Sequence, residues 1–174
     1  RDSDRVKHMM EQDFPEVRYI RRHPGLAAMD HFNVCISEVA APYFCLFHDD
    51  DLLLSDFVEH IKAAIQRFPD AAAIGCNAHI EIRGQLNSRP SFLSAQAYEV
   101  IRKPLELATR YFARYQSGIA PFPGYVYQRA SIGSLRFNAS EGKYSDVTWL
   151  LRLTEKAPLV WISRPLTVSY THLT

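Results

Sequence analysis

The chain has 174 residues, of which 47% are hydrophobic and 22% charged, and its formal net charge is +1. This size and composition are typical of one globular domain with a substantial core, and the near-neutral charge argues against binding to nucleic acid. The three cysteines form no CxxC pair and no apolar run approaches the length of a membrane span, so we expect a cytoplasmic protein with reduced thiols.

In the first half of the chain, segments with helical spacing of apolar residues alternate with short apolar runs. Helices are expected at residues 5–14, about 27–39 and 56–68. The last of these has Ser55 as its N-cap and ends before Pro69. Strands are expected at residues 17–22, 43–48 and 72–82.

The second half is less regular, and residues 85–103 show no clear pattern. Pro104 is a good first residue for a helix, and Ser145 is a good N-cap for another over residues 146–156. A loop rich in proline and glycine leads into a short strand before Ala130, and a last strand is expected at 159–163. This alternation predicts an α/β fold with a mostly parallel sheet flanked by helices, in which ligands bind at the carboxyl ends of the strands.

Three adjacent aspartates, Asp49, Asp50 and Asp51, follow the apolar run 43–48. Their like charges repel unless a cation or solvent compensates them. Because the run is apolar throughout, we expect a strand covered on both faces, with the triplet in a surface cleft at the carboxyl end of a central strand. Such carboxylates suit Mg²⁺ or Mn²⁺. The alternative is a solvated acidic turn that precedes the helix after Ser55.

Residues 31–57, HFNVCISEVAAPYFCLFHDDDLLLSDF, resemble the inverting glycosyltransferase family 2, which has the GT-A fold. The likeness rests on a helix bearing an asparagine, an apolar strand and a DxD-type motif. It implies that Asp50 is the metal ligand, with Asp51 in reserve, and that Asp49 contacts the donor ribose or the metal shell. Asn33 matches the helix asparagine of the family, which implies a cofactor-binding role for it, and a structural role is equally open.

Two positions of this first block depart from the family pattern. His48 stands where the common motif has its first aspartate, and Ser55 stands where the family prefers proline. The departure at His48 leaves open which of the carboxylates act.

A second block, EGKYSDVTWLLRL at 141–153, resembles the segment of the family that carries the catalytic base. Asp146 falls on that position, with Ser145 in place of the usual glutamate. The likeness implies that Asp146 takes a proton from the acceptor hydroxyl, and we expect it across the same cleft from Asp50. A first-turn carboxylate also favours a helix N-terminus without any catalytic role.

The resemblance as a whole implies metal-dependent transfer of a sugar from a nucleotide-diphosphate sugar to an acceptor hydroxyl, with inversion. The implied partners are this donor and a glycan or lipid-linked acceptor, as in polysaccharide biosynthesis. For the full-length protein it also implies peripheral association with a membrane.

The resemblance covers most of residues 4–167, which we expect to form a single domain. Residues 1–3 and 168–174 resemble translated sequencing adapters and are expected to be non-native ends. The first two strands of the family, which read the nucleotide base, would precede residue 1. We therefore expect an N-terminally truncated fold with an open, apolar sheet edge, and leave open whether this fragment binds a donor or is active by itself.

Two other functions fit the sequence. One is a non-catalytic carbohydrate-binding or nucleotide-binding domain, in which His48 and Ser145 mark decay of the catalytic motifs. The other is a metal-dependent phosphohydrolase that uses the aspartate cluster, which is weaker because no second cluster of histidine and aspartate ligands accompanies the triplet.

Overall fold

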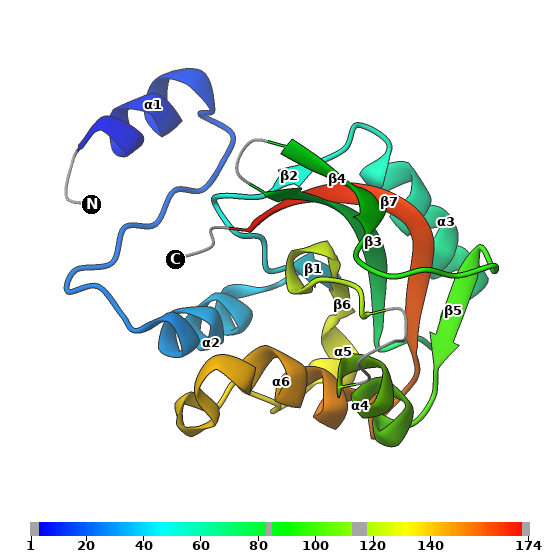
Figure 1. The fold of residues 1–174 in the computed structure, drawn as a ribbon. Coiled ribbons are helices and arrows are strands. Elements are labelled where there is room, and N and C mark those ends of the chain that lie inside the picture. The colour runs from blue at the N-terminus through cyan, green and yellow to red at the C-terminus, as the bar shows by residue number, and fades with distance from the viewer. Residues whose placement is uncertain (1–3, 83–84, 113–117, 172–174) are drawn as a thin grey trace.

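A computed structural model describes residues 4–82, 85–112 and 118–171, and they form one curled sheet with helices on both faces (Figure 1). The strand order is β1-β6-β3-β7-β2, with β4 paired to β3 and β5 paired to β7. The strands are β1 (Tyr43–Cys45), β2 (Leu52–Leu53), β3 (Ala73–Ile82), β4 (Gln85–Pro90), β5 (Tyr98–Ile101), β6 (Val126–Gln128) and β7 (Leu159–Thr171). The helices are α1 (Arg5–Asp13), α2 (Ala28–Glu38), α3 (Phe57–Arg67), α4 (Pro104–Phe112), α5 (Arg129–Ile132) and α6 (Ser145–Thr154), with 3₁₀ helices η1 (Phe122–Gly124) and η2 (Ala139–Tyr144).

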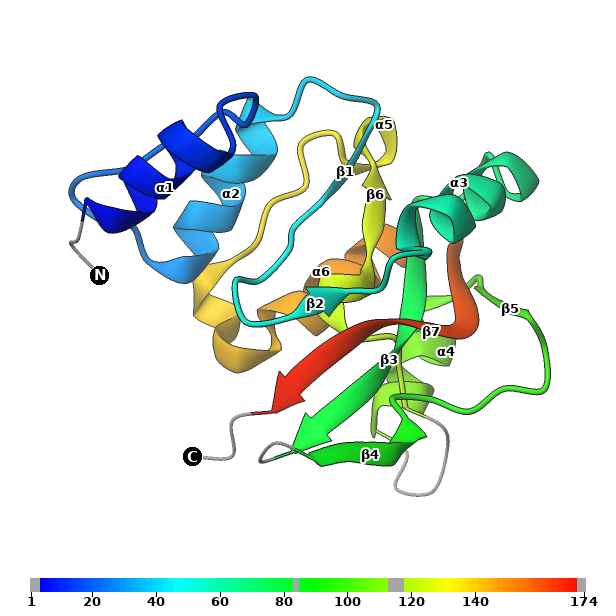
Figure 2. The same cartoon turned by 90° about the horizontal axis from the view of Figure 1, so that it is seen from above.

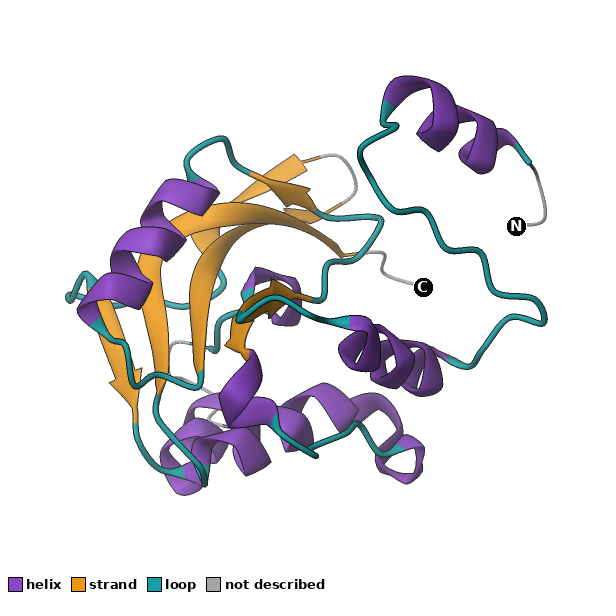
Figure 3. Ribbon diagram, turned by 180° about the vertical axis from the view of Figure 1, so that it is seen from behind, coloured by secondary structure: helices purple, strands orange, loops and turns teal. Residues whose placement is uncertain are grey.

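Two apolar cores lie on opposite faces of the sheet because side chains alternate along its strands. In β7, Leu159 and Trp161 enter the core shared with α2, α4 and α6, whereas Val160 and Ile162 enter the core shared with α3. Figure 3 shows from behind the helices that lie on the two faces of the sheet. The alternation explains why residues 159–162 are all apolar, as expected of a strand covered on both faces.

The long central strands β3 and β7 run parallel and side by side (Figure 2). Their register shifts around Asn77, opposite Pro165, which cannot donate to a ladder and is tolerated at such a bulge. Asn77 is 1% exposed, and its amide group donates to the carbonyl groups of Phe92 and Ser163. Its side-chain oxygen accepts from backbone and hydroxyl groups nearby. One buried side chain thus supplies hydrogen bonds to the backbone groups around the bulge.

The expectation of a mostly parallel sheet is wrong, although the α/β fold with helices on both faces is confirmed. Of the six strand pairings described, only β3–β7 is parallel. The sequence showed no pattern in 85–103, where β4 and β5 return antiparallel to their neighbours. Strand direction depends on such partners, which a local apolar pattern does not reveal.

The expected strand at 17–22 is also wrong, because these residues form no strand. They belong to the segment between α1 and α2, which Figure 1 shows along one side of the molecule, away from the sheet. Val17 and Ile20 are accordingly exposed. Arg18 donates to Glu38 at 2.9 Å, an exposed ion pair of small energetic value.

The last strand is longer than the sequence indicated. β7 continues past Pro165 to Thr171, crossing the boundary expected at residue 167, and its Val168 pairs with Leu52 of β2. At this end of the sheet order, Leu52 and Leu53 are 52% and 43% exposed.

Candidate functional site

The aspartate triplet lies in the loop between β1 and β2, anchored by the buried Leu46. The expected central strand is wrong: β1 has only three residues, lies at one end of the sheet order and, among the described strands, pairs only with β6. The apolar run 43–48 leaves the sheet after Cys45, because its second half packs against side chains instead of strands. Asp49 and Asp50 are exposed, whereas Asp51 is 7% exposed.

His48, Asp50 and Asp51 form a compact group of metal-ligating side chains. Each offers one donor atom, and these atoms lie within 4.8 Å of one another. His48 Nδ1 stands 3.6 Å from Asp51 Oδ2. Donor atoms on opposite sides of a hard divalent cation are about 4–5 Å apart, so this group fits such an ion. Two members of the group, Asp50 and Asp51, were expected from the sequence as metal ligands, and the third, His48, was not expected.

Aromatic rings hold the His48 side chain in place. It stacks on Phe32 of α2, with ring centroids 5.9 Å apart and planes at 18°, and it lies 5.5 Å from the Phe122 ring. Sequence reasoning treated His48 only as a departure from a motif. The apolar residues that precede His48 in the sequence could have indicated that its side chain packs against the rest of the fold, as it does on Phe32 of α2.

Asp146 lies in the first turn of α6, which is anchored by the buried Val147, Leu150 and Leu153. Its Oδ1 accepts a hydrogen bond from the backbone N–H of Val147 at 2.8 Å. The pKa of this half-buried carboxyl is raised, chiefly by burial, against the lowering effects of backbone hydrogen bonds and of the nearby His48. The helix N-terminus therefore favours the ionised form, as expected, but desolvation outweighs it.

Asp146 and His48 line the same cavity, of about 180 Å³. The other lining residues are Met29, Phe32, Phe122, Phe137, Gly142, Lys143 and Ser145. His48 thus belongs both to this cavity and to the group formed with Asp50 and Asp51. The structure therefore brings the first and second resemblance blocks together, although they lie about one hundred residues apart in the chain.

Ser145 does not act as the N-cap expected from the sequence. Its hydroxyl donates to the carbonyl of Gly142 at 2.6 Å and to that of Asn138 at 3.2 Å. These bonds attach the start of α6 to the preceding turn. Ser55 is not an N-cap either, since Asp56 directly precedes α3.

Asn33 bonds to the backbone on the other side of this cavity. Its amide donates to the carbonyl of Phe137 at 3.0 Å, and its oxygen accepts from the N–H of Phe137 at 2.8 Å. This reciprocal pair holds α2 against the segment before α6, which is the structural role left open above. Asp49 is exposed beside the group of His48, Asp50 and Asp51, and its donor contact stays a prediction.

Within the described parts of the chain, no helix has the length and apolar character needed to cross a membrane.

No family model and no curated protein sequence matches the chain. Among solved structures, the chain is similar to residues 1–349 of S. aureus TarS in complex with UDP-GlcNAc, with a TM-score of 0.72, 10% identity and coverage of 99% of this chain and 48% of that one. It is also similar to S. aureus TarS 1–349 crystallised alone, with a TM-score of 0.68, 12% identity and coverage of 97% and 48%. The chain thus spans about half the length of these structures, and what it shares with them is the fold.

Proposed function

We propose that this chain is part of a glycosyltransferase that moves a sugar from a nucleotide-diphosphate sugar to an acceptor hydroxyl with inversion. The observation that carries the proposal is the position of His48, which is a member of the metal-ligating group and also lines the Asp146 cavity. A second support is the fold, because UDP-GlcNAc, the ligand of one similar structure, is a nucleotide-diphosphate sugar.

In this proposal Asp50, Asp51 and His48 hold a divalent cation. When bound, such an ion neutralises charge that develops on the diphosphate leaving group. Two carboxylates suit either Mg²⁺ or Mn²⁺, and the imidazole nitrogen favours Mn²⁺. Asp49, exposed beside them, is the proposed contact to the donor ribose or to the metal shell.

Asp146 is the proposed general base. Its Oδ1 accepts the backbone N–H of Val147, which orients the carboxylate that takes the acceptor proton. Burial raises its pKa, which makes the carboxylate a stronger base than an exposed aspartate. Its helix is anchored in the core, so the group is held in position before the acceptor arrives.

UDP release from UDP-GlcNAc, measured with Mn²⁺ and with EDTA, tests the proposal. We expect release that needs Mn²⁺ and falls by about 10²–10⁴ in Asp146→Asn. Asp70→Asn, an exposed aspartate away from the site, is the control. Donor binding without any release would favour the non-catalytic domain instead. Hydrolysis of p-nitrophenyl phosphate would favour the phosphohydrolase.

A further inference from the structure

A larger cavity lies at the other end of α2 from the site described above. It encloses about 620 Å³ between the C-terminal end of α2, strand β1 and helix α5. Its walls include Ser37, Phe44 and Ile132, none of which lines the Asp146 cavity. Because α2 contributes residues near its start to one cavity and residues near its end to the other, the two are separate places in the fold.

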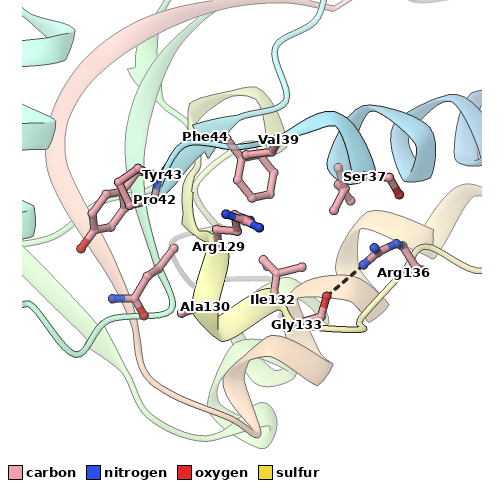
Figure 4. A pocket seen from close by; sticks show the side chains of 12 residues that line it. Ser37, Val39, Pro42, Tyr43, Phe44, Arg129, Ala130, Ile132, Gly133 and Arg136 are labelled. Carbon is pink, nitrogen blue, oxygen red and sulfur yellow. Dashed lines mark hydrogen bonds between the residues drawn. The ribbon is translucent and has the colours of Figure 1, made fainter.

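Two arginines in this cavity are held by backbone carbonyl groups. Arg129 Nη1 donates to the carbonyl of Ala40 at 3.1 Å. Arg136 Nη1 donates to Gly133 and Leu135, at 3.1 and 2.7 Å. Figure 4 shows the two guanidinium groups on either side of Ile132, both beside the cavity. A guanidinium has five N–H donors, so each group keeps donors for a further acceptor.

Within the described part of the chain, no carboxylate forms an ion pair with either of these arginines. Among the lining residues, all of which are described, none is aspartate or glutamate. Carbonyl groups orient a guanidinium but do not neutralise it, so the cavity has an excess of positive charge that an anion would balance.

Apolar side chains form much of the remaining wall, together with the polar Ser37 and Gln128. The side chains of Val39, Phe44 and Ile132 face the same space as the arginines (Figure 4). A volume of about 620 Å³ is within the range of sites that take a small organic ligand. Planar, forked guanidinium groups match the oxygens of a phosphate in particular. We propose that this cavity binds a phosphate-bearing molecule, with the phosphate at Arg129 and Arg136 and an apolar or ring portion against Phe44.

Titration with pyrophosphate in EDTA, followed by ¹H–¹⁵N NMR, tests the proposal on the chain as it is. We expect saturable shifts at the amides of Ser37 and Gly133 and at the side chains of both arginines. In the double variant Arg129→Gln/Arg136→Gln the affinity should fall at least tenfold. Arg102→Gln, which removes an exposed arginine outside this cavity, should keep the wild-type affinity.

The double variant Arg129→Lys/Arg136→Lys keeps the charge and guards against misfolding of the glutamine variant. It should weaken binding severalfold, because lysine lacks the forked geometry. Two further probes separate the sources of the phosphate: sn-glycerol 3-phosphate in solution, and vesicles of phosphatidylcholine with phosphatidic acid. Binding of the first alone assigns a soluble ligand, and co-sedimentation with the vesicles that needs both arginines assigns a lipid. Pyrophosphate shifts that are absent, or that survive in both double variants, would overturn the proposal.

Discussion

Asp146 combines a proposed catalytic role with a cost to stability. The fold raises the pKa of this carboxyl, mainly through burial. The folded protein therefore binds the Asp146 proton more tightly than the unfolded chain does. The stability that this gives is fully present below the pKa of the unfolded chain, about 3.9, and is lost as the pH rises through the pKa of the folded protein. We expect Asp146→Asn to be more stable than the wild type near pH 7, and the difference to vanish near pH 3.

Urea unfolding of the wild type and of Asp146→Asn at several pH values measures this effect. If Asp146→Asn is less stable than the wild type at pH 7, the account of a desolvated carboxylate is wrong. Together with a loss of UDP release in the same variant, a gain in stability would separate the chemical role of Asp146 from a structural one.

Gly75 of β3 leaves room for two aromatic rings of the core. A Cβ at this position would stand 2.6 Å from Tyr125 Cε1 and 3.0 Å from Trp161 Cδ1. Both rings are fully buried and have no space to retreat. We expect Gly75→Ala to lower the free energy of unfolding by about 1–3 kcal/mol, measured by chemical denaturation.

Gly25 provides the matched control for this substitution. An added Cβ at Gly25 meets nothing within 4 Å, so Gly25→Ala should change stability by less than about 1 kcal/mol. Equal effects of the two substitutions would show that the close packing of Gly75 against the rings does not matter.

At the residue scale, the sequence indicated most of the candidate site. The three adjacent aspartates stood out because like charges after an apolar run need an explanation, whereas Asp146 was identified only by the resemblance of residues 141–153. His48 was missed as a site member because its neighbours Phe32 and Phe122 come from distant parts of the chain. The raised pKa of Asp146 was also missed, since burial depends on the closing of α2 and η1 over α6.

At the scale of elements, the bulge between β3 and β7 depends on Asn77. Its buried side chain makes five hydrogen bonds, to Phe92, Ser163, Ala78 and Ser91. Asn77→Ala leaves several of these buried groups without a partner, so we expect a loss of about 3 kcal/mol in the free energy of unfolding. Gln66→Ala, on the exposed side of α3, should change it by less than about 0.5 kcal/mol.

Asn77→Asp is a second test of the same bulge. It keeps the shape and the accepting oxygen but removes the two donated bonds and buries a charge, so it should be at least as harmful as alanine. An aspartate variant with wild-type stability would contradict this view of the bulge.

Local pattern predicted the helices better than the strands. The described helices of eight or more residues were all expected, from apolar spacing in α1, α2 and α3, from Pro104 in α4 and from the Ser145 signal in α6, although Ser145 is not the N-cap. The hairpin of β3 and β4, and the pairing of β5 with β7, were not predictable because strands gain stability from partners elsewhere in the chain. The run at 17–22 failed for the same reason: among the described strands, none pairs with it.

At the scale of the whole molecule, the two ends of α2 border two different cavities. One contains Asp146 and His48, and the other contains Arg129 and Arg136. The larger of the two is not the one that the resemblance identifies. Sequence reasoning missed it because its arginines become neighbours only when α5 packs beside the end of α2.

The central claim is that Asp50 belongs to a metal site that binds a nucleotide-diphosphate sugar, and calorimetric titration with UDP-GlcNAc tests it most directly. We expect saturable binding that requires Mn²⁺. Asp50→Asn should weaken this binding at least about tenfold, because substitutions of residues that only support metal ligands already cause losses of that size. Asp146→Asn and Asp70→Asn should bind UDP-GlcNAc as the wild type does. Asp50→Asn should also fold with undiminished stability, because it removes one of three adjacent like charges. Equal affinity in EDTA, or equal affinity of Asp50→Asn and the wild type, would contradict the claim.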